Sequence, residues 1–378
     1  MPYFQDGYWG YVNANLKWII QPQFLVAYPF NEGIAQVKLD TNRYNLSGWQ
    51  LLAPNGTFLL SQPADNIQFL GNKLFAVWQN AKMGVYNAAK TWVLQPEFIN
   101  TTEEGTQLKD GLLCVRTLSG YGIISLSGEW ILSPKYQSIV IHTGQIAELI
   151  DNKSSCLYHL SRKEVIVDSV EAVGEFAFNR LPVRKGKLWG FLDTAGNWVQ
   201  KPMYAHFFSF SESLAAVLYQ GSWGFLDTAG NWAIAPKYQL VRSFSEGKAA
   251  VKSSEKWGFI NNLNEWIIEP TYAEAFSFRE KLALVKFQQK WYFLNPNGFT
   301  PIQLNLSINA SVFTPSSGFK ENCFLFQNEN GKYQFLAKNG LLLTTYEFDY
   351  AEPFYNGLAL IRIDNQNLYL TNKGTILR

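Results

Sequence analysis

The hydrophobic pattern of this chain repeats along its length. Residues 186–287 hold three copies of one unit, in which short apolar runs alternate with turns rich in Gly, Asp, Asn and Ser. The tryptophans Trp189, Trp223, Trp257 and Trp291 follow each other at steps of 34 residues. A fixed period of this size is typical of repeat architectures. The chain is therefore predicted to consist of tandem copies of one small structural unit.

The central unit shows which secondary structure to expect. Its apolar runs are 214–218, 223–227 and 231–235, and the turns between them are 220–222 and 228–230. Short apolar runs bounded by turn residues predict β-strands. The third run is expected to end at Pro236, which cannot donate to a strand ladder. Residues 239–244 are expected to add a short fourth strand, so each unit is predicted to be a three- or four-stranded antiparallel meander.

The side chains of the second run indicate how the units pack. Trp223 and Phe225 point to one face of the strand, while Gly224 and Leu226 point to the other. Because neither face is polar, each sheet is expected to lie between two neighbours. Large-against-small stacking of small sheets predicts an all-β, propeller-like fold. An open β-solenoid or spiral, or two five-bladed rings, would bury the same faces.

The same register extends over residues 1–378. The repeat anchors are Trp9, Trp49, Met83, Tyr121, Cys156, Trp189, Trp223, Trp257, Trp291, Tyr333 and Leu368. A proline recurs thirteen residues after many anchors, and an aromatic residue follows two positions later. The chain is thus predicted to be a single array of ten repeats and a truncated eleventh, with a possible division near 155–186.

This pattern resembles the WG repeat family of bacterial proteins. Its units carry a Trp-Gly dyad, an aspartate-to-glycine turn, an apolar-x-Pro-x-aromatic step and a Phe-Ser-Glu-Gly segment. Residues 234–238 (IAPKY) and 244–247 (FSEG) match these features closely. The resemblance implies an interaction or scaffolding role, and it supplies no catalytic residues to transfer.

Composition narrows the classes of function. The chain is 47% hydrophobic and 16% charged, with a net charge of +2 and no basic run. This argues against a nucleic-acid or membrane partner held by bulk electrostatics. The cysteines Cys114, Cys156 and Cys323 are far apart within apolar runs, and the start of the chain lacks the pattern of a signal peptide. A reducing, cytoplasmic setting is therefore expected.

Residue spacing offers little chemistry. The histidines His142, His159 and His206 occupy unrelated positions in different repeats, so neither a zinc site nor a nucleophile–His–acid triad is predicted. The turn that begins at Asp193 has too few acidic residues for a calcium loop, and Asp is expected only to cap the bend there. No cofactor is expected. A pair of carboxylates such as Glu103 or Glu104 with Glu246 stays open as an acid–base possibility.

The candidate contact residues lie where the repeat is broken. Three insertions, at 40–48, 100–110 and 305–322, lengthen the 34-residue step with polar segments, and such insertions map to loops. They place Tyr44, Glu103, Glu104 and Phe313 in candidate partner-binding loops. Trp78 is the one tryptophan outside the two repeating Trp positions, so it is a candidate for an exposed contact residue.

Three hypotheses about function follow. The first is a non-enzymatic interaction scaffold that binds a protein or peptide through a rigid β surface and its longer loops. The second is a glycan-binding module that uses exposed aromatic side chains, with Trp78 and Tyr44 as candidates. The third is a hydrolase with its site at the mouth of a propeller. The sequence favours the first hypothesis because charge is low and the start of the chain lacks the pattern of a signal peptide.

Overall fold

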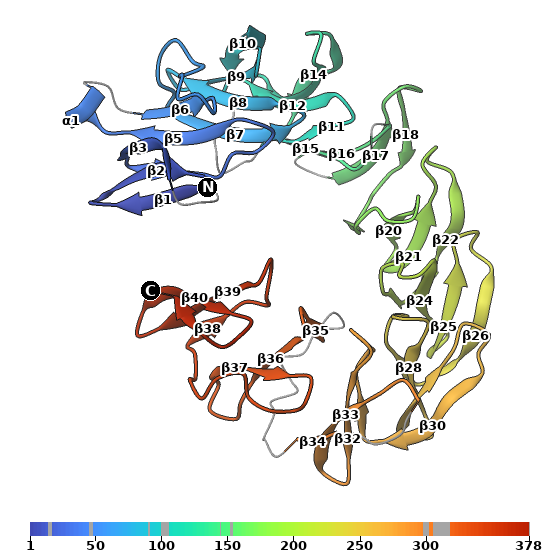
Figure 1. Cartoon of the computed structure of the whole chain (residues 1–378). Helices are drawn as coiled ribbons and strands as arrows, with labels where there is room; N and C mark the ends of the chain where they lie inside the picture. Colours follow the sequence, from blue (N-terminus) through green and yellow to red (C-terminus); the bar gives the residue numbers. More distant parts are fainter. Residues whose placement is uncertain are drawn as a thin grey trace. The chain divides into compact units, whose positions relative to one another are not determined.

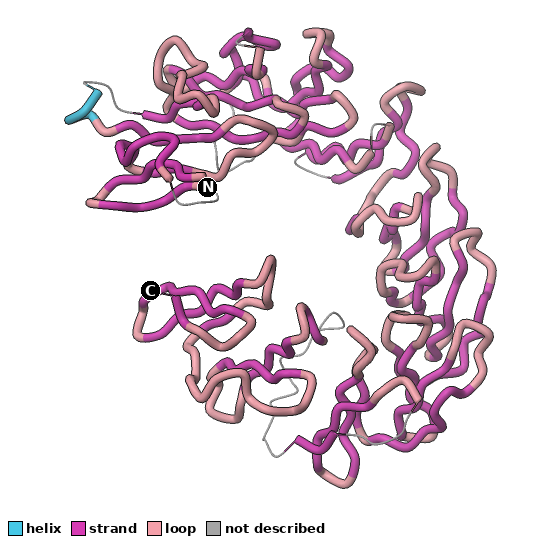
Figure 2. Tube along the Cα trace, in the orientation of Figure 1, coloured by secondary structure: helices cyan, strands magenta, loops and turns pink. Residues whose placement is uncertain are grey.

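The computed structural model describes residues 1–13, 17–44, 48–89, 91–99, 106–143, 145–151, 154–297, 302–304 and 318–377. These residues form two compact units, each described by itself below. One unit comprises Met1–Val170 with Thr194–Gly196, and the other comprises Glu171–Asp193 with Asn197–Arg378. Both are built from small antiparallel sheets (Figures 1 and 2). The all-β prediction of tandem antiparallel meanders is confirmed.

The first unit contains five sheets and one short helix. The sheets are β1 (Pro2–Gln5), β2 (Tyr8–Val12) and β3 (Trp18–Phe24); β4 (Val26–Ala27), β5 (Ala35–Leu39) and β6 (Gly48–Leu52); β7 (Asn66–Gly71), β8 (Leu74–Gln79), β9 (Lys82–Asn87) and β10 (Thr91–Phe98); β11 (Leu108–Lys109), β12 (Leu112–Thr117), β13 (Gly120–Ser125) and β14 (Trp130–Tyr136); and β15 (Ser138–Ile141), β16 (Ile146–Asp151), β17 (Ser154–His159) and β18 (Glu164–Val167). The helix α1 (Thr41–Tyr44) follows β5.

The second unit contains six sheets. They are β19 (Ala172–Val173), β20 (Leu181–Lys185), β21 (Leu188–Leu192) and β22 (Trp198–Tyr204); β23 (His206–Phe207), β24 (Leu214–Tyr219), β25 (Ser222–Asp227) and β26 (Trp232–Tyr238); β27 (Leu240–Val241), β28 (Ala249–Ser253), β29 (Lys256–Ile260) and β30 (Trp266–Tyr272); β31 (Glu274–Ala275), β32 (Ala283–Phe287), β33 (Lys290–Leu294) and β34 (Ile302–Leu304); β35 (Phe319–Lys320), β36 (Cys323–Gln327) and β37 (Tyr333–Ala337); and β38 (Tyr350–Ala351), β39 (Leu358–Ile363), β40 (Gln366–Thr371) and β41 (Ile376–Leu377).

The short strand belongs to the following sheet, which corrects the predicted unit. Strand β27, expected to extend the sheet of β24–β26, pairs instead with β28 of the next sheet, with Leu240 opposite Lys252. The chain leaves β26 after Tyr238, and the backbone N–H of Gln239 already bonds to the carbonyl of Lys252. A periodic sequence carries no mark of where one unit ends, so its phase could not be predicted.

The fourth strand passes through its proline instead of ending there. Between the pairs Trp223–Tyr238 and Phe225–Ile234, β25 advances two residues while β26 advances four. The extra residues form a bulge around Pro236. Residues in a bulge do not pair in the ladder, so the N–H that proline lacks is not needed there. The expectation that the strand ends at Pro236 is therefore wrong.

The bulge explains the glycine of the Trp-Gly dyad. A Cβ atom on Gly224 would lie 2.6 Å from the carbonyl oxygen of Ile234 and 2.8 Å from the nitrogen of Pro236. Both contacts are to backbone, which cannot swing away as a side chain can. The same crowding recurs at Gly10, Gly84, Gly122, Gly190 and Gly258. Glycine is needed here for the close approach of two strands rather than for an unusual φ angle.

Two sheets without this glycine show what replaces the bulge: a regular strand ladder in one and a side-chain amide in the other. Tyr292 of β33 pairs with Gln303 of β34 in a regular ladder without a shift of register. Gln50 of β6 is 3% exposed and replaces strand pairing with its side-chain amide. Its Nε2 donates to the carbonyl of Leu60 at 3.0 Å, while its Oε1 accepts from the Leu60 N–H at 3.0 Å. The amide thus satisfies a buried backbone segment that would otherwise lose its partners.

Apolar clusters join each sheet to the next within a unit, as propeller-like packing requires. One cluster brings Trp223 and Phe225 against Phe244 and Val251 of the following sheet. The predicted burial of both sheet faces is confirmed there, since Phe225 and Leu226 point to opposite faces and both are buried. Ring closure and the number of blades in a ring stay predictions.

A series of glutamates holds successive sheets in register. Each lies in the turn before the second strand and accepts a hydrogen bond from a backbone N–H in the equivalent turn one repeat later. The pairs are Glu32 with Lys73 (2.7 Å), Glu212 with Gly247 (3.0 Å), Glu246 with Lys281 (3.0 Å), Glu280 with Asn322 (2.8 Å) and Glu321 with Gly357 (2.7 Å). Equivalent turns of successive sheets therefore lie side by side.

Candidate interaction surface

Trp78 lies in the core and is not an exposed contact residue. Its side chain is 5% exposed and packs in a cluster with Met83, Phe98 and Leu113. Trp78 pairs across the strands with Met83, the residue at the anchor position of that repeat. In this repeat the tryptophan lies on β8 and the methionine takes the anchor position on β9, so the two side chains fill the same space from exchanged strands. The expectation of surface exposure is wrong for this reason.

The other candidate contact residues have different outcomes. Tyr44 is half-buried, and its ring stacks on Phe24 with centroids 6.5 Å apart. Its hydroxyl donates to Oε1 of Gln23, and burial raises the pKa of the phenol. Glu103, Glu104 and Phe313 lie outside the described residues. A partner-binding role for these four residues stays a prediction.

Tryptophans at the start of the fourth strands reach the surface, although sequence reasoning assigned them to packing alone. Trp232 is 39% exposed, and one edge of its ring contacts Tyr204 of the preceding sheet, with centroids 6.0 Å apart. Trp130 is equally exposed beside Phe98. The anchor tryptophans Trp223 and Trp257 are buried. The two Trp positions of the repeat therefore differ in what they offer a ligand.

The aspartate turns cap themselves, as predicted. Oδ1 of Asp227 accepts a hydrogen bond from the backbone N–H of Asn231 at 2.8 Å, and Gly230 between them has φ +85°. Asp193 makes the same bond to Asn197. Among the residues that the structure describes, no group of three His, Cys, Asp or Glu side chains lies close enough to hold a metal ion.

One polar cluster brings together a histidine, a glutamate and a serine. Oε2 of Glu148 lies 3.2 Å from Nε2 of His142, and the hydroxyl of Ser155 donates to Oε1 of the same carboxylate. The hydrogen bond from His142, followed by that from Ser155, holds the pKa of Glu148 below its ordinary value despite partial burial. Nucleophilic catalysis needs the histidine next to the serine. Here the glutamate lies between them, so the three residues do not have the order of a Ser–His–acid triad.

Glu246 has a structural task. Its carboxylate accepts the backbone N–H of Lys281 through both oxygens, at 3.2 and 3.0 Å. The acid–base pair suggested for Glu246 with Glu103 or Glu104 involves two residues outside the described ones. A carboxylate engaged by the neighbouring sheet is poorly placed to exchange protons with a substrate.

Basic side chains gather on one edge of four sheets in the second unit. We call this the hairpin edge: it is the edge of the sheets β19–β22, β23–β26, β27–β30 and β31–β34 at which the second strand turns into the third. Its basic residues are Arg184, Lys185, Lys187, Lys237, Lys252, Lys256, Lys286 and Lys290, and its acidic residues are Glu171, Glu255 and Glu274. The edge therefore has an excess of positive charge.

Cation–π contacts support the basic side chains of the hairpin edge. The guanidinium carbon of Arg184 lies 5.7 Å from the ring centroid of Trp189, and Nζ of Lys286 lies 5.5 Å from that of Trp291. Each pair is directly opposite across the second and third strands. A cation above a tryptophan face gains electrostatic attraction and keeps its charge at the surface. The repeat thus sets a cation beside an anchor tryptophan in several sheets.

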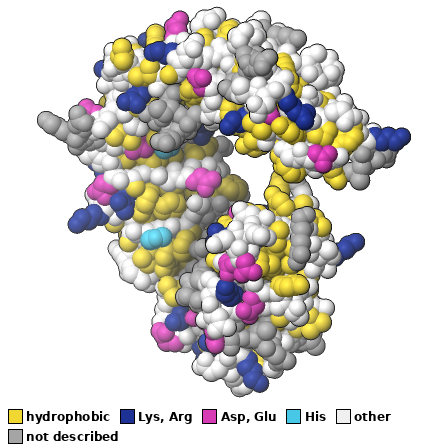
Figure 3. All heavy atoms as spheres, turned by 90° about the vertical axis from the view of Figure 1, so that its left-hand side faces the viewer, with side chains coloured by type: hydrophobic (Ala, Val, Ile, Leu, Met, Phe, Trp, Pro, Cys, Tyr) yellow, Lys and Arg dark blue, Asp and Glu magenta, His cyan; other side chains and the backbone are white. Residues whose placement is uncertain are grey.

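The opposite edge, called here the turn edge, has acidic residues that are already engaged. Asp193 and Asp227 cap their own turns, and Glu212, Glu246 and Glu280 bind the backbone of the next sheet. The two edges of these sheets therefore differ in charge. The face drawn in Figure 3 shows acidic and basic side chains scattered among apolar ones.

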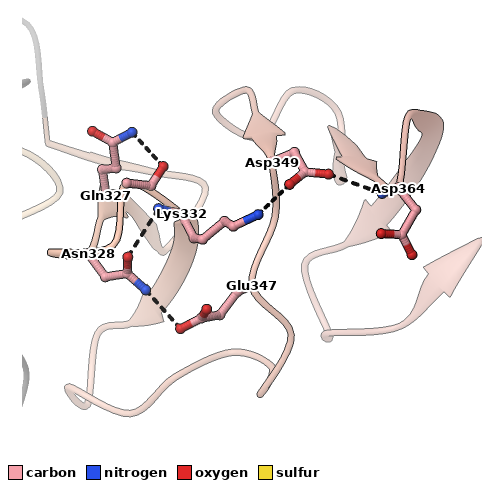
Figure 4. Close-up of polar contacts among 7 residues, drawn as sticks. Gln327, Asn328, Lys332, Glu347, Asp349 and Asp364 are labelled. Atoms are coloured by element: carbon pink, nitrogen blue, oxygen red, sulfur yellow. Dashed lines mark hydrogen bonds and ion pairs between the residues drawn. The ribbon is translucent and has the colours of Figure 1, made fainter.

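The corresponding hairpin of the next sheet, between β36 and β37, holds its lysine in a polar network. Nζ of Lys332 donates to Oδ1 of Asp349 at 2.5 Å, and Asn328 donates to Glu347 at 2.8 Å (Figure 4). The other oxygen of Asp349 accepts the backbone N–H of Asp364. The hydrogen bond to Asp349 raises the pKa of Lys332, and the same contact lowers the pKa of Asp349. This lysine is thus paired with a carboxylate, as Lys252 of the hairpin edge is with Glu255 at 2.9 Å and Arg184 with Glu171 at 3.4 Å.

Sequence comparison identifies the repeat. Residues 9–43, 121–140, 189–221, 223–257, 257–291 and 338–366 match a family model described as WG containing repeat. Comparison with curated protein sequences finds no match to the chain. The described residues contain no helix long and apolar enough to cross a membrane.

Several solved structures are similar at low identity. The dihydro-heme d1 dehydrogenase NirN in complex with DHE is 11% identical over 72% of this chain and 73% of its own, with a TM-score of 0.38. BamB from Moraxella catarrhalis is 11% identical over 93% of this chain and 96% of its own, with a TM-score of 0.34. A eukaryotic initiation factor is 12% identical over 89% and 93%, with a TM-score of 0.35. Nothing about function follows from likenesses at these scores.

Proposed function

Because the chain belongs to the WG repeat family, we propose that it is a non-enzymatic scaffold that binds a protein or peptide partner. The observation that supports this most is the hairpin edge of the second unit. There, side chains on four successive sheets face outward from a backbone held by ladders, apolar clusters and inter-sheet hydrogen bonds. Preorganised side chains bind a partner with little loss of conformational entropy.

The exposed edge strands favour binding through side chains. The fourth strands β22, β26 and β30 carry bulges around Pro202, Pro236 and Pro270. Proline and a bulge both prevent a partner strand from continuing the ladder. A partner would therefore contact side chains at the edges of the sheets and the longer loops instead of adding a strand.

The proposed setting is the cytoplasm of a bacterial cell. In the part of the chain that the structure describes, Cys114, Cys156 and Cys323 are not joined in disulfides, and two of them are buried. Burial and nearby carboxylates raise the pKa of Cys156 and bring that of Cys323 to about 11, so neither thiol is activated as a nucleophile. Thiols kept reduced and inert suit a binding protein of a reducing compartment.

Photo-crosslinking in the cells that make the protein tests the scaffold proposal. A photoreactive amino acid replaces Leu188 on the hairpin edge or, as a matched control, the exposed Leu263 on the turn edge. The proposal expects one protein to be crosslinked from position 188 far more than from position 263. That protein, purified, should bind the intact chain in isothermal titration calorimetry. Absence of any crosslinked protein that binds on its own would contradict the proposal.

A glycan-binding module is the second candidate, supported by the exposed rings of Trp130 and Trp232. Stacking on sugar rings requires aromatic faces that reach solvent, as these do. Affinity electrophoresis in gels that contain polysaccharides compares the intact chain with Trp130→Ala and Trp232→Ala. Retardation that both substitutions abolish would favour this candidate over a protein partner.

A further inference from the structure

The hairpin edge combines positive charge with exposed apolar side chains. Leu188, Met203, Leu240 and Phe287 are all more than a third exposed and lie on this edge. Three of these residues lie directly opposite a lysine on the neighbouring strand: Leu188 opposite Lys185, Leu240 opposite Lys252 and Phe287 opposite Lys290. Cations and bulky apolar groups therefore alternate along the edge.

The sheets place these pairs in one row. At this edge Tyr204 contacts Tyr219 of the next sheet, and Tyr272 contacts Phe287, with ring centroids 6.1 and 6.3 Å apart. Packed sheets lie about 10 Å apart, so four sheets give a row of about 30 Å. An extended peptide of about ten residues has this length.

We infer that the hairpin edge binds an extended acidic segment in which carboxylates alternate with bulky apolar residues. This inference rests on the proposed scaffold function and names the chemistry of its partner. The exposed Lys256 and Lys290 pair with the carboxylates, while Leu240 and Phe287 cover the apolar side chains. Complementary charge steers the encounter and sets the register, and the apolar contacts slow dissociation.

A protein segment fits this edge better than a nucleic acid. The anchor tryptophans Trp223, Trp257 and Trp291 are buried, so they are unavailable to stack on bases. The exposed apolar residues are mainly aliphatic, and a phosphate backbone offers them nothing to cover. Glu171, Glu255 and Glu274 also interrupt the row of cations, which suits spaced carboxylates more than a continuous phosphate chain.

The lysines at the tips of the hairpins are the ones to test. Lys256 and Lys290 begin strands β29 and β33 and are exposed. The double variant Lys256→Glu/Lys290→Glu reverses both charges without touching the core. The matched control is Lys281→Glu/Lys373→Glu, which changes the net charge equally at exposed turn positions away from the hairpin edge.

Fluorescence anisotropy measures binding of a fluorescein-labelled peptide of about ten residues that alternates Glu with Leu. The intact chain should bind it, and the hairpin-edge variant should lose at least about tenfold in affinity, which is about 1.4 kcal/mol. The control variant should stay within about twofold. Raising the salt from about 50 to about 300 mM should weaken binding by the intact chain and have little effect on the variant.

Two further arms separate charge from apolar contact. Leu240→Ser/Phe287→Ser should reduce affinity for the Glu/Leu peptide but not for a Glu/Ser peptide. Leu263→Ser/Leu341→Ser, at exposed turn positions away from the hairpin edge, should change neither. A labelled RNA oligonucleotide of equal charge should bind more weakly than the Glu/Leu peptide. Unchanged melting temperatures establish that the variants fold.

Several results would overturn the inference. These are equal loss in the hairpin-edge and control variants, binding of Glu/Ser as tight as Glu/Leu, or preference for RNA. If a protein is crosslinked from position 188 but the charge reversals do not change the affinity for the Glu/Leu peptide, the scaffold proposal stands and this inference fails. If no protein is crosslinked from position 188, the scaffold proposal itself fails.

Discussion

The sheets β23–β26 and β4–β6 solve the same packing problem in different ways. In the first, Gly224 leaves room for the bulge at Pro236, and backbone lies directly against backbone. In the second, Gln50 stands at the position after the tryptophan and binds Leu60 through its amide. The residue after the anchor tryptophan therefore depends on whether the neighbouring strand bulges toward it. The Trp-Gly dyad describes packing and does not mark a binding site.

The largest effect is expected from closing the space at the bulge. Gly224→Ala places a methyl group 2.6 Å from a carbonyl oxygen, so β26 must shift. We expect a loss of about 3 kcal/mol in the free energy of unfolding, measured by urea denaturation, because overpacking against backbone relaxes poorly. Gly174→Ala, whose added methyl group would have side-chain atoms of Phe207 and Pro182 at 3.0 Å as its nearest neighbours, should cost less than half as much. Equal costs would contradict the role given to the bulge.

The next effect probes the irregular sheet. Gln50→Leu keeps the volume but leaves the N–H and the carbonyl of Leu60 without their amide partner. Buried backbone groups without partners cost about 1–3 kcal/mol, so we expect a loss of about 2 kcal/mol in urea denaturation. Gln36→Leu, a half-buried position on the neighbouring strand β5, serves as control. A Gln50→Leu variant as stable as the intact chain would remove the distinction drawn between the sheets.

The sheet β15–β18, which lacks both the Gly and the Pro, should respond to pH. Because the folded-state pKa of Glu148 is lowered, its carboxylate stabilises the fold above the ordinary value of 4.5. That contribution should disappear as the pH falls through the lowered pKa. Urea denaturation between about pH 6 and about pH 3 should therefore show a steeper loss for the intact chain than for Glu148→Gln. Parallel curves would show that the His142–Glu148 contact contributes no stability.

The smallest effect concerns the glutamates between sheets. Glu246→Ala removes an exposed carboxylate bound to the N–H of Lys281, so we expect a loss below about 1 kcal/mol. Hydrogen exchange of the turn at Lys281 should nevertheless become faster, since its amide loses its acceptor. Glu329→Ala, an exposed glutamate in a different turn, should leave that exchange rate unchanged. No change at Lys281 would mean that the sheets keep register without this contact.

Sequence predicted the parts of the fold that repeat. The 34-residue period, the strands and the burial of residues such as Phe225 on both sheet faces follow from spacing and polarity alone. The Pro236 bulge was not predicted, because the proline was treated as a strand end. Its signal was present, since Gly224 and Pro236 recur together and are lost together in repeats such as that of Leu157.

The candidate contact residues were predicted less well. Trp78 was chosen because it stands outside the repeating Trp positions, yet it lies five residues before the anchor Met83, the place that Lys252 and Lys286 take before their own anchors. A column of basic residues at that place pointed to the hairpin edge. Which of those side chains reach solvent depends on how the sheets stack, and spacing alone does not carry that information.

A double-mutant cycle between Gly224 and Pro236 tests the central claim most directly. If the glycine is present because the bulged strand lies against it, Pro236→Ala should let that strand move away from a new methyl group. The account predicts that Gly224→Ala/Pro236→Ala costs at least about 1 kcal/mol less in urea denaturation than the two single substitutions added together. Additive costs would contradict it, and the Trp-Gly dyad would then need another explanation.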